Sequence, residues 1–476
     1  MADTKKASFG IVGLGVMGQN LALNVEEHGF SVALWNLETD WTEKFLATHK
    51  GKRFQGTKTL AELVSALERP RRILIMIKAG APVDSTLDTL CPLLEADDVV
   101  IEGGNSWFED TRRREAACRQ KEIRFVGMGV SGGEEGARHG PSLMPGGEKS
   151  AYERLKPVLE AIAAKTDRGP CVAHCGPDGA GHFVKTVHNG IEYAVMQLLA
   201  ETYDVLRRGY GLSLEDLART FEQWNQGPLE SFLVDLTAKI FRVKDKETGG
   251  PLLDLVVDKA GQKGTGKWTA QVALDLAVPV PTIAAAIDAR VLSSLKDERV
   301  QASKKLEGSR AKPPAGDRAA LVDAARDALL ASTIAAYAQG MALIRAASTE
   351  YKWSTPLGEM ARIWRAGCII RARLLTPIEA AFVQDPSLAN LLLDPELGGL
   401  VVARQGAWRR TVGVAQELGI PVPALSSALA YFDSYRTANL PQSLTQAQRD
   451  AFGAHTYERT DHPERGFVHT EWLGKV

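Results

Sequence analysis

The sequence predicts an α/β domain with a parallel sheet, followed by a large all-helical domain and a C-terminal tail. Short apolar segments alternate with amphipathic helical stretches as far as Cys175. Long helical periods then follow, with almost no strand-like segment among them. The final stretch is polar and aromatic-rich and lacks apolar periodicity. These changes of pattern predict domains at residues 1–177 and 178–438 and a tail at 439–476.

The strands of the first domain are expected where short apolar segments are bounded by turn residues. These segments are residues 8–13, 31–36, 72–77, 98–102, 124–129 and 171–175. Residues 73–77 are apolar on both faces of the pleat, which is typical of a central parallel strand covered on both sides. The helical stretches between the strands favour a parallel sheet, because parallel strands need such crossovers.

The second domain is expected to contain two long helices, at residues 178–208 and 317–348. Asp178 suits the start of the first helix and Gly209 its end. Two long helices in successive parts suggest two similar halves, although no repeat is visible in the residues themselves. The tail has no core pattern, so it is expected to lie on another surface or to be disordered.

The composition is that of an ordinary globular protein, with 45% apolar and 24% charged residues among 476. Lys and Arg total 57 against 58 Asp and Glu, so the basic surplus of proteins that bind nucleic acid or anionic membranes is missing. No signal peptide or transmembrane segment is expected. Five cysteines, an odd number, fit free thiols in a reducing compartment and predict a cytoplasmic protein. Cys171 and Cys175 lack a second pair at zinc spacing, so no metal site is predicted.

A glycine-rich turn follows the first expected strand, with the sequence Gly13-Leu14-Gly15-Val16-Met17-Gly18. Before a helix, the first Gly allows a tight turn, the second lets the backbone approach a pyrophosphate and the third lets the helix pack on the strand. The strand–turn–helix context disfavours the alternative of three glycines in an ordinary turn. The first domain is therefore predicted to be of the Rossmann type and to bind a dinucleotide.

Three further turns follow later strands of this domain, namely Lys78-Ala79-Gly80, Glu102-Gly103-Gly104-Asn105 and Ser131-Gly132-Gly133. They are expected at the carboxyl edge of the sheet, where ligands of such folds bind. The last could hold a carboxylate through its amides and hydroxyl. Each could also be a plain turn.

A polar stripe interrupts an otherwise apolar helix of the second domain. Its members stand at i, i+3, i+4 and i+7 and share one helix face: Lys185, His188, Asn189 and Glu192. Lys185 and Glu192 lie about 10 Å apart along the axis, one for each end of a small substrate. Low polarity lowers the pKa of a lysine and makes it a base near neutral pH. The alternative is an internal polar network or a wet surface stripe.

Residues 260–269 nearly form a nucleotide-triphosphate-binding loop, but Trp268 occupies the position where Ser or Thr must bind magnesium. Two lysines, Lys263 among them, and the Thr265 hydroxyl suit a phosphate monoester instead. Further candidate cations, or ordinary surface residues, are Arg290 and Arg449.

Together these motifs resemble the 6-phosphogluconate dehydrogenase (decarboxylating) family, in order from one end of the chain to the other. Besides the turns named above, the resemblance is carried by residues 130–136, 185–193, 261–269, 365–371 and 446–457. It implies an enzyme of the oxidative pentose phosphate pathway that converts 6-phosphogluconate to ribulose 5-phosphate and CO₂ with reduction of NADP or NAD. It also implies a homodimer whose tails reach into the partner subunit, with Arg449 and His455 completing the site in trans.

The resemblance also implies residue roles. Lys185 resembles the general base that takes the 3-hydroxyl proton, and Glu192 the acid that protonates C1 of the enediol. The residues that match the surroundings of the substrate carboxylate and hydroxyls are Asn105, Ser131, Gly132, Gly133, His188 and Asn189. Those at the phosphate end are Tyr193, Lys263, Thr265, Arg290, Arg449 and His455. Those for the cofactor are Gly13, Leu14, Gly15, Val16, Met17, Gly18, Asn36, Leu37, Glu38, Lys78, Ala79, Gly80 and Asn105.

The chain departs from the family pattern where the 2′-phosphate of NADP would bind. Members that use NADP typically have Asn-Arg-Thr there and a Lys three positions later, whereas this chain has Leu37, Glu38 and Trp41 in place of Arg, Thr and Lys. Losing two cations and gaining an anion favours NAD, or the use of both cofactors. Alternatively, Glu38 and Asp40 merely cap the next helix and another group holds the phosphate.

Two other functions stay open. The chain could be a β-hydroxyacid dehydrogenase for another substrate, although the smaller members of that class lack the loop with Lys263 and the tail. It could also be a nicotinamide-cofactor-binding protein without catalysis, against which Lys185 and Glu192 are both present.

Overall fold

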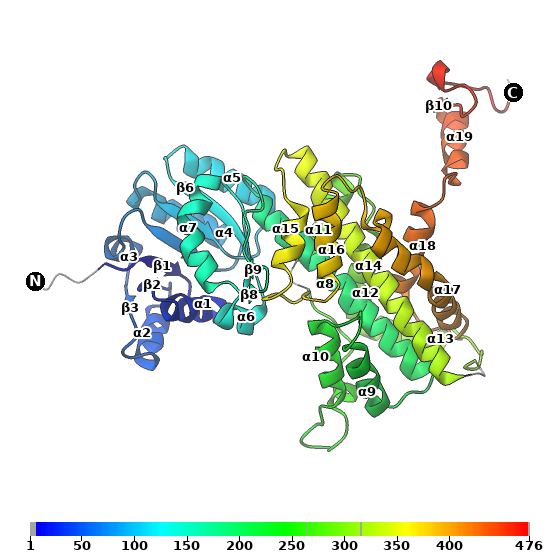
Figure 1. The fold of residues 1–476 in the computed structure, drawn as a ribbon, viewed down its shortest axis with the longest axis horizontal. Coiled ribbons are helices and arrows are strands. Elements are labelled where there is room, and N and C mark those ends of the chain that lie inside the picture. The colour runs from blue at the N-terminus through cyan, green and yellow to red at the C-terminus, as the bar shows by residue number, and fades with distance from the viewer. Residues whose placement is uncertain (1–5, 263, 315–316, 475–476) are drawn as a thin grey trace, which may run out of the picture. The chain divides into compact units, whose positions relative to one another are not determined.

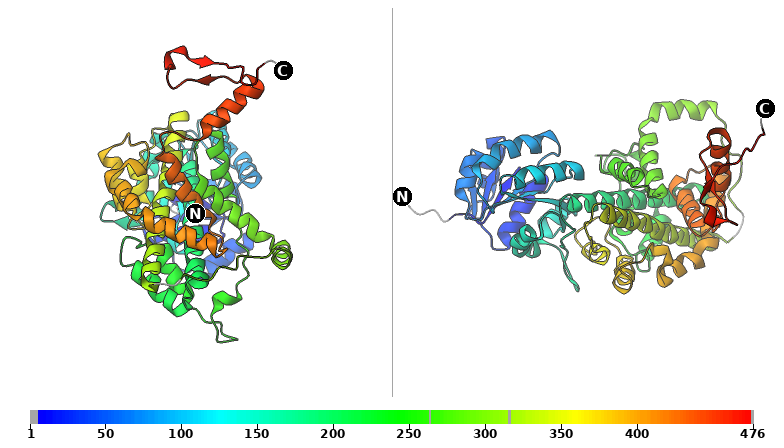
Figure 2. Two further views of the ribbon diagram at one scale, coloured as in Figure 1. Left: turned by 90° about the vertical axis from the view of Figure 1, so that its right-hand side faces the viewer. Right: turned by 90° about the horizontal axis from the view of Figure 1, so that it is seen from above.

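The computed structural model describes residues 6–262, 264–314 and 317–474. The chain divides into two compact units, residues 1–428 and 429–476. The first unit contains a sheet flanked by helices and then a large group of packed helices (Figures 1 and 2). This is the fold class that the sequence predicts. Lys263 lies outside the described residues.

The N-terminal sheet has seven strands in the order β3-β2-β1-β4-β5-β6-β7. The first six run parallel to their neighbours, whereas β7 is antiparallel to β6. The strands are β1 Phe9–Val12, β2 Val32–Trp35, β3 Phe54–Gly56, β4 Arg72–Ile75, β5 Val99–Glu102, β6 Arg124–Ser131 and β7 Ser142–Pro145.

The sheet differs from the expected one at three segments. Residues 171–175 were predicted to be a strand, which is wrong: this segment makes one isolated bridge, between Val172 and Leu143. The short β3 and the antiparallel β7 were not predicted. Only the short α6 (Gly133–His139) separates β6 from β7, and so short a connection suits an antiparallel pair.

Helices cover both faces of the sheet (Figure 1). One apolar layer joins the strands to α1 (Val16–Glu27), α6 and α7 (Lys149–Ile162), with Leu21 and Leu155 in its core. The other layer joins them to α3 (Leu60–Ala66), α4 (Ala81–Leu90) and α5 (Phe108–Arg119). Because apolar side chains pack on both faces, the central strands have little room for polar residues. The helix α2 (Thr39–Thr48) follows β2, and the two-residue strands β8 (Lys165–Thr166) and β9 (Gly169–Pro170) form a small hairpin.

The helix α8 (Ala180–Asp204) connects the sheet to the helical part. It contacts β6 and β7 and then α11, α12 and α14. The expected helix at residues 178–208 is confirmed, and a π-helical turn, Val205–Gly209, extends it. The second expected helix is also confirmed as α14 (Arg318–Glu350), which begins where the Asp317 carboxylate accepts a hydrogen bond from the Ala319 amide.

By length and composition α14 could cross a membrane, but 89% of its most apolar window is buried inside the protein, as in a core helix. It packs against α8 and α17. The other helices of the helical part are α9 Leu214–Trp224, α10 Phe232–Phe241, α11 Thr265–Asp275, α12 Pro281–Ser294, α13 Lys296–Lys305, α15 Leu357–Ile363, α16 Leu375–Gln384, α17 Pro395–Glu417 and α18 Pro423–Tyr435.

The tail has internal order that its sequence pattern did not predict. It contains α19 (Gln442–Gly453) and a hairpin of β10 (Tyr457–Glu458) and β11 (Phe467–Val468). The buried Asp450 carboxylate joins these parts. It accepts four hydrogen bonds, at 2.8–3.0 Å, from the Thr456 and Thr470 amides, the His469 ring and the Trp472 indole. A polar centre, rather than an apolar face, therefore organises this segment.

Candidate active site

The glycine-rich turn lies between β1 and α1, as the sequence predicts. Gly13 has a left-handed backbone with φ of 98°, and a Cβ there would lie 2.5 Å from the Met76 carbonyl oxygen. A Cβ on Gly18 would collide with the Gly13 oxygen, whereas Gly15 has no heavy atom within 4 Å of such a position. The turn is thus packed on one side and open at Gly15, beside the first amides of α1. This arrangement fits the close approach of a pyrophosphate.

A cleft of about 970 Å³ opens beside this turn. Its lining includes five residues of the predicted cofactor set: Gly13, Asn36, Leu37, Glu38 and Lys78. Leu14, within the turn, is buried, while Val16 and Met17 begin α1. The cleft also has Lys58 and Thr59 in its wall, from the connection between β3 and α3. Sequence reasoning missed these two residues because β3 is too short to have an apolar pattern.

Asn36 links the glycine-rich turn to Glu38. Its Oδ1 accepts a hydrogen bond from the Leu14 amide at 2.8 Å, and its Nδ2 donates to Glu38 Oε2 at 2.8 Å. Glu38 occupies the N-cap position of α2, yet within the described residues its side chain makes no capping hydrogen bond. The Glu38 carboxylate is therefore held beside the cleft, and Leu37 is 78% exposed there.

The other two expected cofactor turns follow the neighbouring parallel strands β4 and β5. Lys78 and Ala79 lead to Gly80, which precedes α4 with a φ of 91°. Asn105 is exposed between β5 and α5. Because β4 and β5 are paired in register, both turns lie at the same edge of the sheet as the glycine-rich turn.

The polar stripe of α8 lies in the protein interior. Lys185 is 6% exposed, His188 and Asn189 are also buried, and the Glu192 side chain is 20% exposed. The strand β6 packs directly on this helix, since a Cβ on Gly129 would clash with the Lys185 side chain. The stripe thus faces the carboxyl edge of the sheet rather than solvent.

The two central residues of the stripe have partners on other elements. His188 Nε2 lies 3.3 Å from the Ser131 hydroxyl at the end of β6, and its Nδ1 lies 3.1 Å from Asn189 Oδ1. Asn189 Nδ2 donates to Thr265 Oγ1 at 3.1 Å. These bonds bring β6, α8 and the start of α11 together around one site.

The two outer residues, Lys185 and Glu192, are different. Among the described residues, no side chain or backbone group forms a hydrogen bond with the Lys185 ammonium or the Glu192 carboxylate. His188 Nδ1 lies 3.9 Å from Glu192 Oε2. Burial lowers the pKa of Lys185, although the charge of Glu192 opposes this. Burial likewise raises the pKa of Glu192. These are the shifts that a base and an acid near neutral pH require.

His188 is set apart by its protonation. Burial, and then the charge of Lys185, hold its pKa well below the usual value. The ring is therefore neutral and can position a ligand or orient its neighbours without adding charge.

The turn Ser131-Gly132-Gly133 connects β6 to α6 beside this stripe. Gly132 has a φ of 114°, and a Cβ there would lie 2.5 Å from the Gly367 carbonyl oxygen. Gly133 has open space around its Cβ position. The sequence of the turn did not indicate Gly367, which lies in the segment 365–371 and packs against Gly132.

The expected phosphate end combines α8, α11 and α12. The Arg290 guanidinium lies 3.5 Å from the centroid of the Tyr193 ring, and its Nη1 donates to the Gly261 carbonyl. Thr265 was expected in a loop, which is wrong, because it is the buried first residue of α11. Its position places the first amides of that helix beside the stripe, and helix N-termini favour phosphate.

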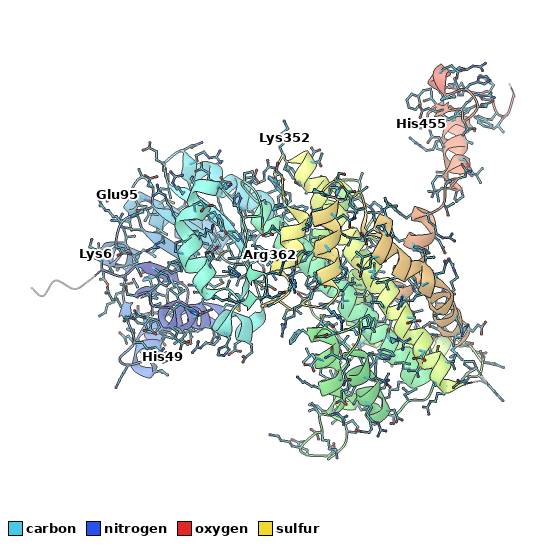
Figure 3. The ribbon with its side chains drawn as sticks, in the orientation of Figure 1. Lys6, His49, Glu95, Lys352, Arg362 and His455 are labelled. Atoms are coloured by element: carbon cyan, nitrogen blue, oxygen red, sulfur yellow. The ribbon has the colours of Figure 1, made fainter. Side chains whose placement is uncertain are left out.

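Arg449 and His455 lie in the second compact unit. Arg449 donates to the Gln446 side chain at 2.9 Å, and the His455 ring lies 5.9 Å from that of Phe452. Figure 3 labels His455 in this tail. Ala454 and Thr456, on either side of His455, both have left-handed backbones. The other predicted substrate residues that the structure describes all lie in the first unit. Those of β6, α6, α8, α11 and α12 lie around the stripe, and Asn105 lies at the neighbouring edge of the sheet.

The remaining chemistry of the chain is simple. All five cysteines are buried free thiols. In the part of the chain that the structure describes, no group of three or more His, Cys, Asp or Glu side chains could hold a metal ion.

Comparison with known proteins gives consistent matches over the whole chain. The family model "NAD binding domain of 6-phosphogluconate dehydrogenase" matches residues 8–176, and "6-phosphogluconate dehydrogenase, C-terminal domain" matches residues 181–472. The 6-phosphogluconate dehydrogenase, NADP(+)-dependent, decarboxylating, of Bacillus subtilis (strain 168) is 54% identical over 98% of this chain and 99% of its own length. The decarboxylating enzyme of Synechocystis sp. is 56% identical over 99% of both chains.

A solved structure supports the same relationship. The 6-phosphogluconate dehydrogenase of Plasmodium falciparum, described in apo form, with NADP⁺ and with 6-phosphogluconate, is 41% identical and has a TM-score of 0.94. The match covers 98% of this chain and 100% of that one. By sequence and by fold, this chain belongs to the 6-phosphogluconate dehydrogenase family.

Proposed function

We propose that this chain oxidatively decarboxylates 6-phosphogluconate to ribulose 5-phosphate and CO₂ with reduction of a nicotinamide cofactor. The observation that carries the proposal is the pair Lys185 and Glu192 on one helix face. Lys185 is buried and the Glu192 side chain is 20% exposed, and neither charged group has a hydrogen-bond partner among the described residues. A purely structural network would satisfy such groups internally. A ligand between them is the better explanation, and membership of the family supports the identity of that ligand.

The cofactor fits the chain's own groups. A bound cofactor would be held at its pyrophosphate by the turn that contains Gly15, and Asn36, Leu37 and Glu38 would border its adenosine half. Lys78, Ala79, Gly80 and Asn105 lie along the same edge of the sheet. When bound, the nicotinamide accepts the hydride that leaves C3 of the substrate.

Lys185 acts first, as a base. Its neutral amine takes the proton of the 3-hydroxyl while the C3–H bond breaks and the hydride leaves, so that C3 becomes a ketone. Burial supports this role because it lowers the pKa of Lys185 and makes the neutral amine accessible near neutral pH.

The 3-keto acid then loses CO₂, because the electrons of the breaking bond pass to the new ketone. Lys185, now an ammonium, donates a hydrogen bond to the oxygen on which negative charge develops. Glu192 protonates C1 of the enediol and thus forms the ketose. Burial raises the pKa of Glu192, which favours the protonated carboxyl that this step needs.

The other site residues position the substrate. The carboxylate and hydroxyls are contacted by Asn105, Ser131, Gly132, Gly133, His188 and Asn189. The phosphate end is contacted by Tyr193, Lys263, Thr265 and Arg290, and by Arg449 and His455 of the partner subunit. The active form is accordingly a homodimer, and a cytoplasmic location suits its five free thiols.

The first prediction tests the reaction itself. Incubation of the purified protein with 6-phosphogluconate and either cofactor is expected to release CO₂ and reduced nicotinamide in equal amounts, with ribulose 5-phosphate as the product. If a β-hydroxy acid that lacks the phosphate is oxidised faster than 6-phosphogluconate, the result would instead support a β-hydroxyacid dehydrogenase for another substrate. If neither 6-phosphogluconate nor another β-hydroxy acid is oxidised, the result would support a nicotinamide-cofactor-binding protein without catalysis.

We further propose that the chain uses NAD, either in preference to NADP or beside it. Glu38 is held by Asn36 beside the cleft, where NAD-binding folds place an acid for the ribose hydroxyls. Leu37 brings no charge to the same wall, and the partly exposed Trp41 could stack on adenine. Lys58 and Lys78 oppose this reading, because either could attract a 2′-phosphate.

The second prediction follows from this balance of charges. We expect kcat/KM with NAD to equal or exceed that with NADP. The double substitution Leu37→Arg, Glu38→Thr should shift the ratio about tenfold or more toward NADP, because it adds a charge-assisted bond and removes a repulsive anion.

The single substitution Lys58→Met is the companion control. If Lys58 binds the 2′-phosphate of NADP, this variant should have a lower kcat/KM with NADP and an unchanged kcat/KM with NAD. A wild-type enzyme that strongly favours NADP would contradict the proposed preference for NAD.

A further inference from the structure

Arg114 on α5 lies beneath the two turns that follow β4 and β5. Its side chain is 1% exposed, although a guanidinium is among the costliest groups to bury. The same two turns border the proposed cofactor site. The contacts of Arg114 therefore connect the interior of the sheet domain to that site.

Every N–H group of this guanidinium has an acceptor. Nε and Nη2 bind the two oxygens of Asp84 at 2.8 and 3.1 Å, and Nη2 also donates to the Gly80 carbonyl at 3.1 Å. Nη1 donates to Glu102 Oε1 at 2.9 Å and to the Ser106 hydroxyl at 3.5 Å. Five N–H groups in a planar fork thus join α4, the turn before it and the turn after β5.

The arrangement leaves these turns little freedom. Gly80 begins α4 in a left-handed conformation, and its carbonyl is bonded directly to Arg114. Glu102, which is fully buried, is the last residue of β5. The Ser106 hydroxyl donates a hydrogen bond to its carboxylate, and Asn105 lies between these two residues in the chain. A shift of either turn would remove an acceptor from a buried charge, which is costly.

We propose that Arg114 is a positioning residue for cofactor binding, because it fixes the spacing of the turns that contain Gly80 and Asn105. The nature of the ligand rests on the proposed function. The positioning itself rests on the five hydrogen bonds. Arg114 touches neither substrate nor cofactor in this proposal and acts through the two turns.

Arg114→Lys is the direct test, because it keeps the charge and loses the planar fork. Arg113→Lys is the matched control: Arg113 is the preceding residue of α5, its side chain is 58% exposed, and its bonds go to Asp84 and Asp110. The cofactor Kd, measured by fluorescence titration of the full-length protein without substrate, should rise about tenfold or more in Arg114→Lys. In Arg113→Lys it should stay within about twofold.

Kinetics separate positioning from general damage. In Arg114→Lys the cofactor KM should rise with its Kd, and by a larger factor than the KM for 6-phosphogluconate. Asn105 is the one proposed substrate residue on a turn bonded to Arg114, whereas β6 and α8 supply most of the others. If Arg114→Lys does not fold, Asp84→Asn replaces it, since Asp84 is partly exposed and the change keeps its shape. That variant should show the same selective loss of cofactor affinity.

An unchanged cofactor Kd in a folded Arg114→Lys or Asp84→Asn protein would overturn the role of Arg114, as would an equal loss in Arg113→Lys. These titrations need no turnover. A wild-type protein that binds cofactor but does not oxidise 6-phosphogluconate would therefore count against the proposed function alone.

Discussion

Lys185→Met is expected to lower kcat by about 10²–10⁴-fold, the usual contribution of a positioned base, while 6-phosphogluconate still binds. Met has nearly the length of Lys and removes the ammonium, which has no hydrogen-bond partner among the described residues to be left unsatisfied. The fold should therefore survive the change. The measurements are steady-state kcat and the Kd of 6-phosphogluconate by calorimetry.

Glu192→Gln is the natural comparison, because it should fail at a later step. In a single turnover, this variant should form reduced cofactor rapidly and then stall, whereas Lys185→Met should form almost none.

The pH dependence of kcat/KM provides a second test of Lys185 as the base. Wild-type kcat/KM should fall as the pH drops through the lowered pKa of Lys185, since the ammonium cannot accept a proton, and Lys185→Met should lose this acidic limb. Turnover like wild type in Lys185→Met would exclude it as the base.

The parts of the site that sequence reasoning could predict are those with local signals. The turn with Gly13, Gly15 and Gly18 needs only its spacing and the strand before it, since each glycine answers a steric demand within the same turn. The stripe from Lys185 to Glu192 needs only the helical period. Both are confirmed in position, because α1 and α8 begin close to where the sequence predicts.

The parts that sequence reasoning missed depend on contacts between distant segments. Lys58 reaches the cofactor cleft only because β3 pairs with β2, and the three residues of β3 have no readable pattern. Gly367 packs against Gly132, although more than two hundred residues separate them in the chain, and the sequence near neither residue predicts this contact. Arg114 has the composition of a surface helix around it, and only the fold shows that it is buried.

The tail shows a different kind of error. Its lack of apolar periodicity suggested that it had no internal order, yet Asp450 organises it through four hydrogen bonds to one carboxylate. Pattern analysis measures apolar faces and does not register such a polar centre. The consequence concerns function, because Arg449 precedes Asp450 and His455 precedes the amide of Thr456 that Asp450 binds. The tail therefore presents the two predicted trans residues from an ordered segment.

Removal of residues 439–476 is expected to abolish turnover, while the protein still binds cofactor through the sheet domain.

The Arg449→Ala subunit should be nearly inactive at ordinary substrate levels, with the KM for 6-phosphogluconate raised about tenfold or more, since a bond from Arg to phosphate is charge-assisted. The measurements are kcat and KM with 6-phosphogluconate and the cofactor Kd of the truncated protein.

Mixing two inactive variants decides which subunit supplies the tail. In a heterodimer of Arg449→Ala with Lys185→Met, one site combines an intact Lys185 with the intact tail of the other subunit, so activity should return at up to half of the sites. If each tail served its own subunit, both sites would carry one defect and activity would stay absent. A heterodimer of Arg449→Ala with His455→Ala is the control, because both sites then receive a damaged tail under either arrangement. Recovery in the first mixture but not the second, in heterodimers verified by two affinity tags, would place Arg449 in trans. Its failure in such verified heterodimers would place the whole site within one chain.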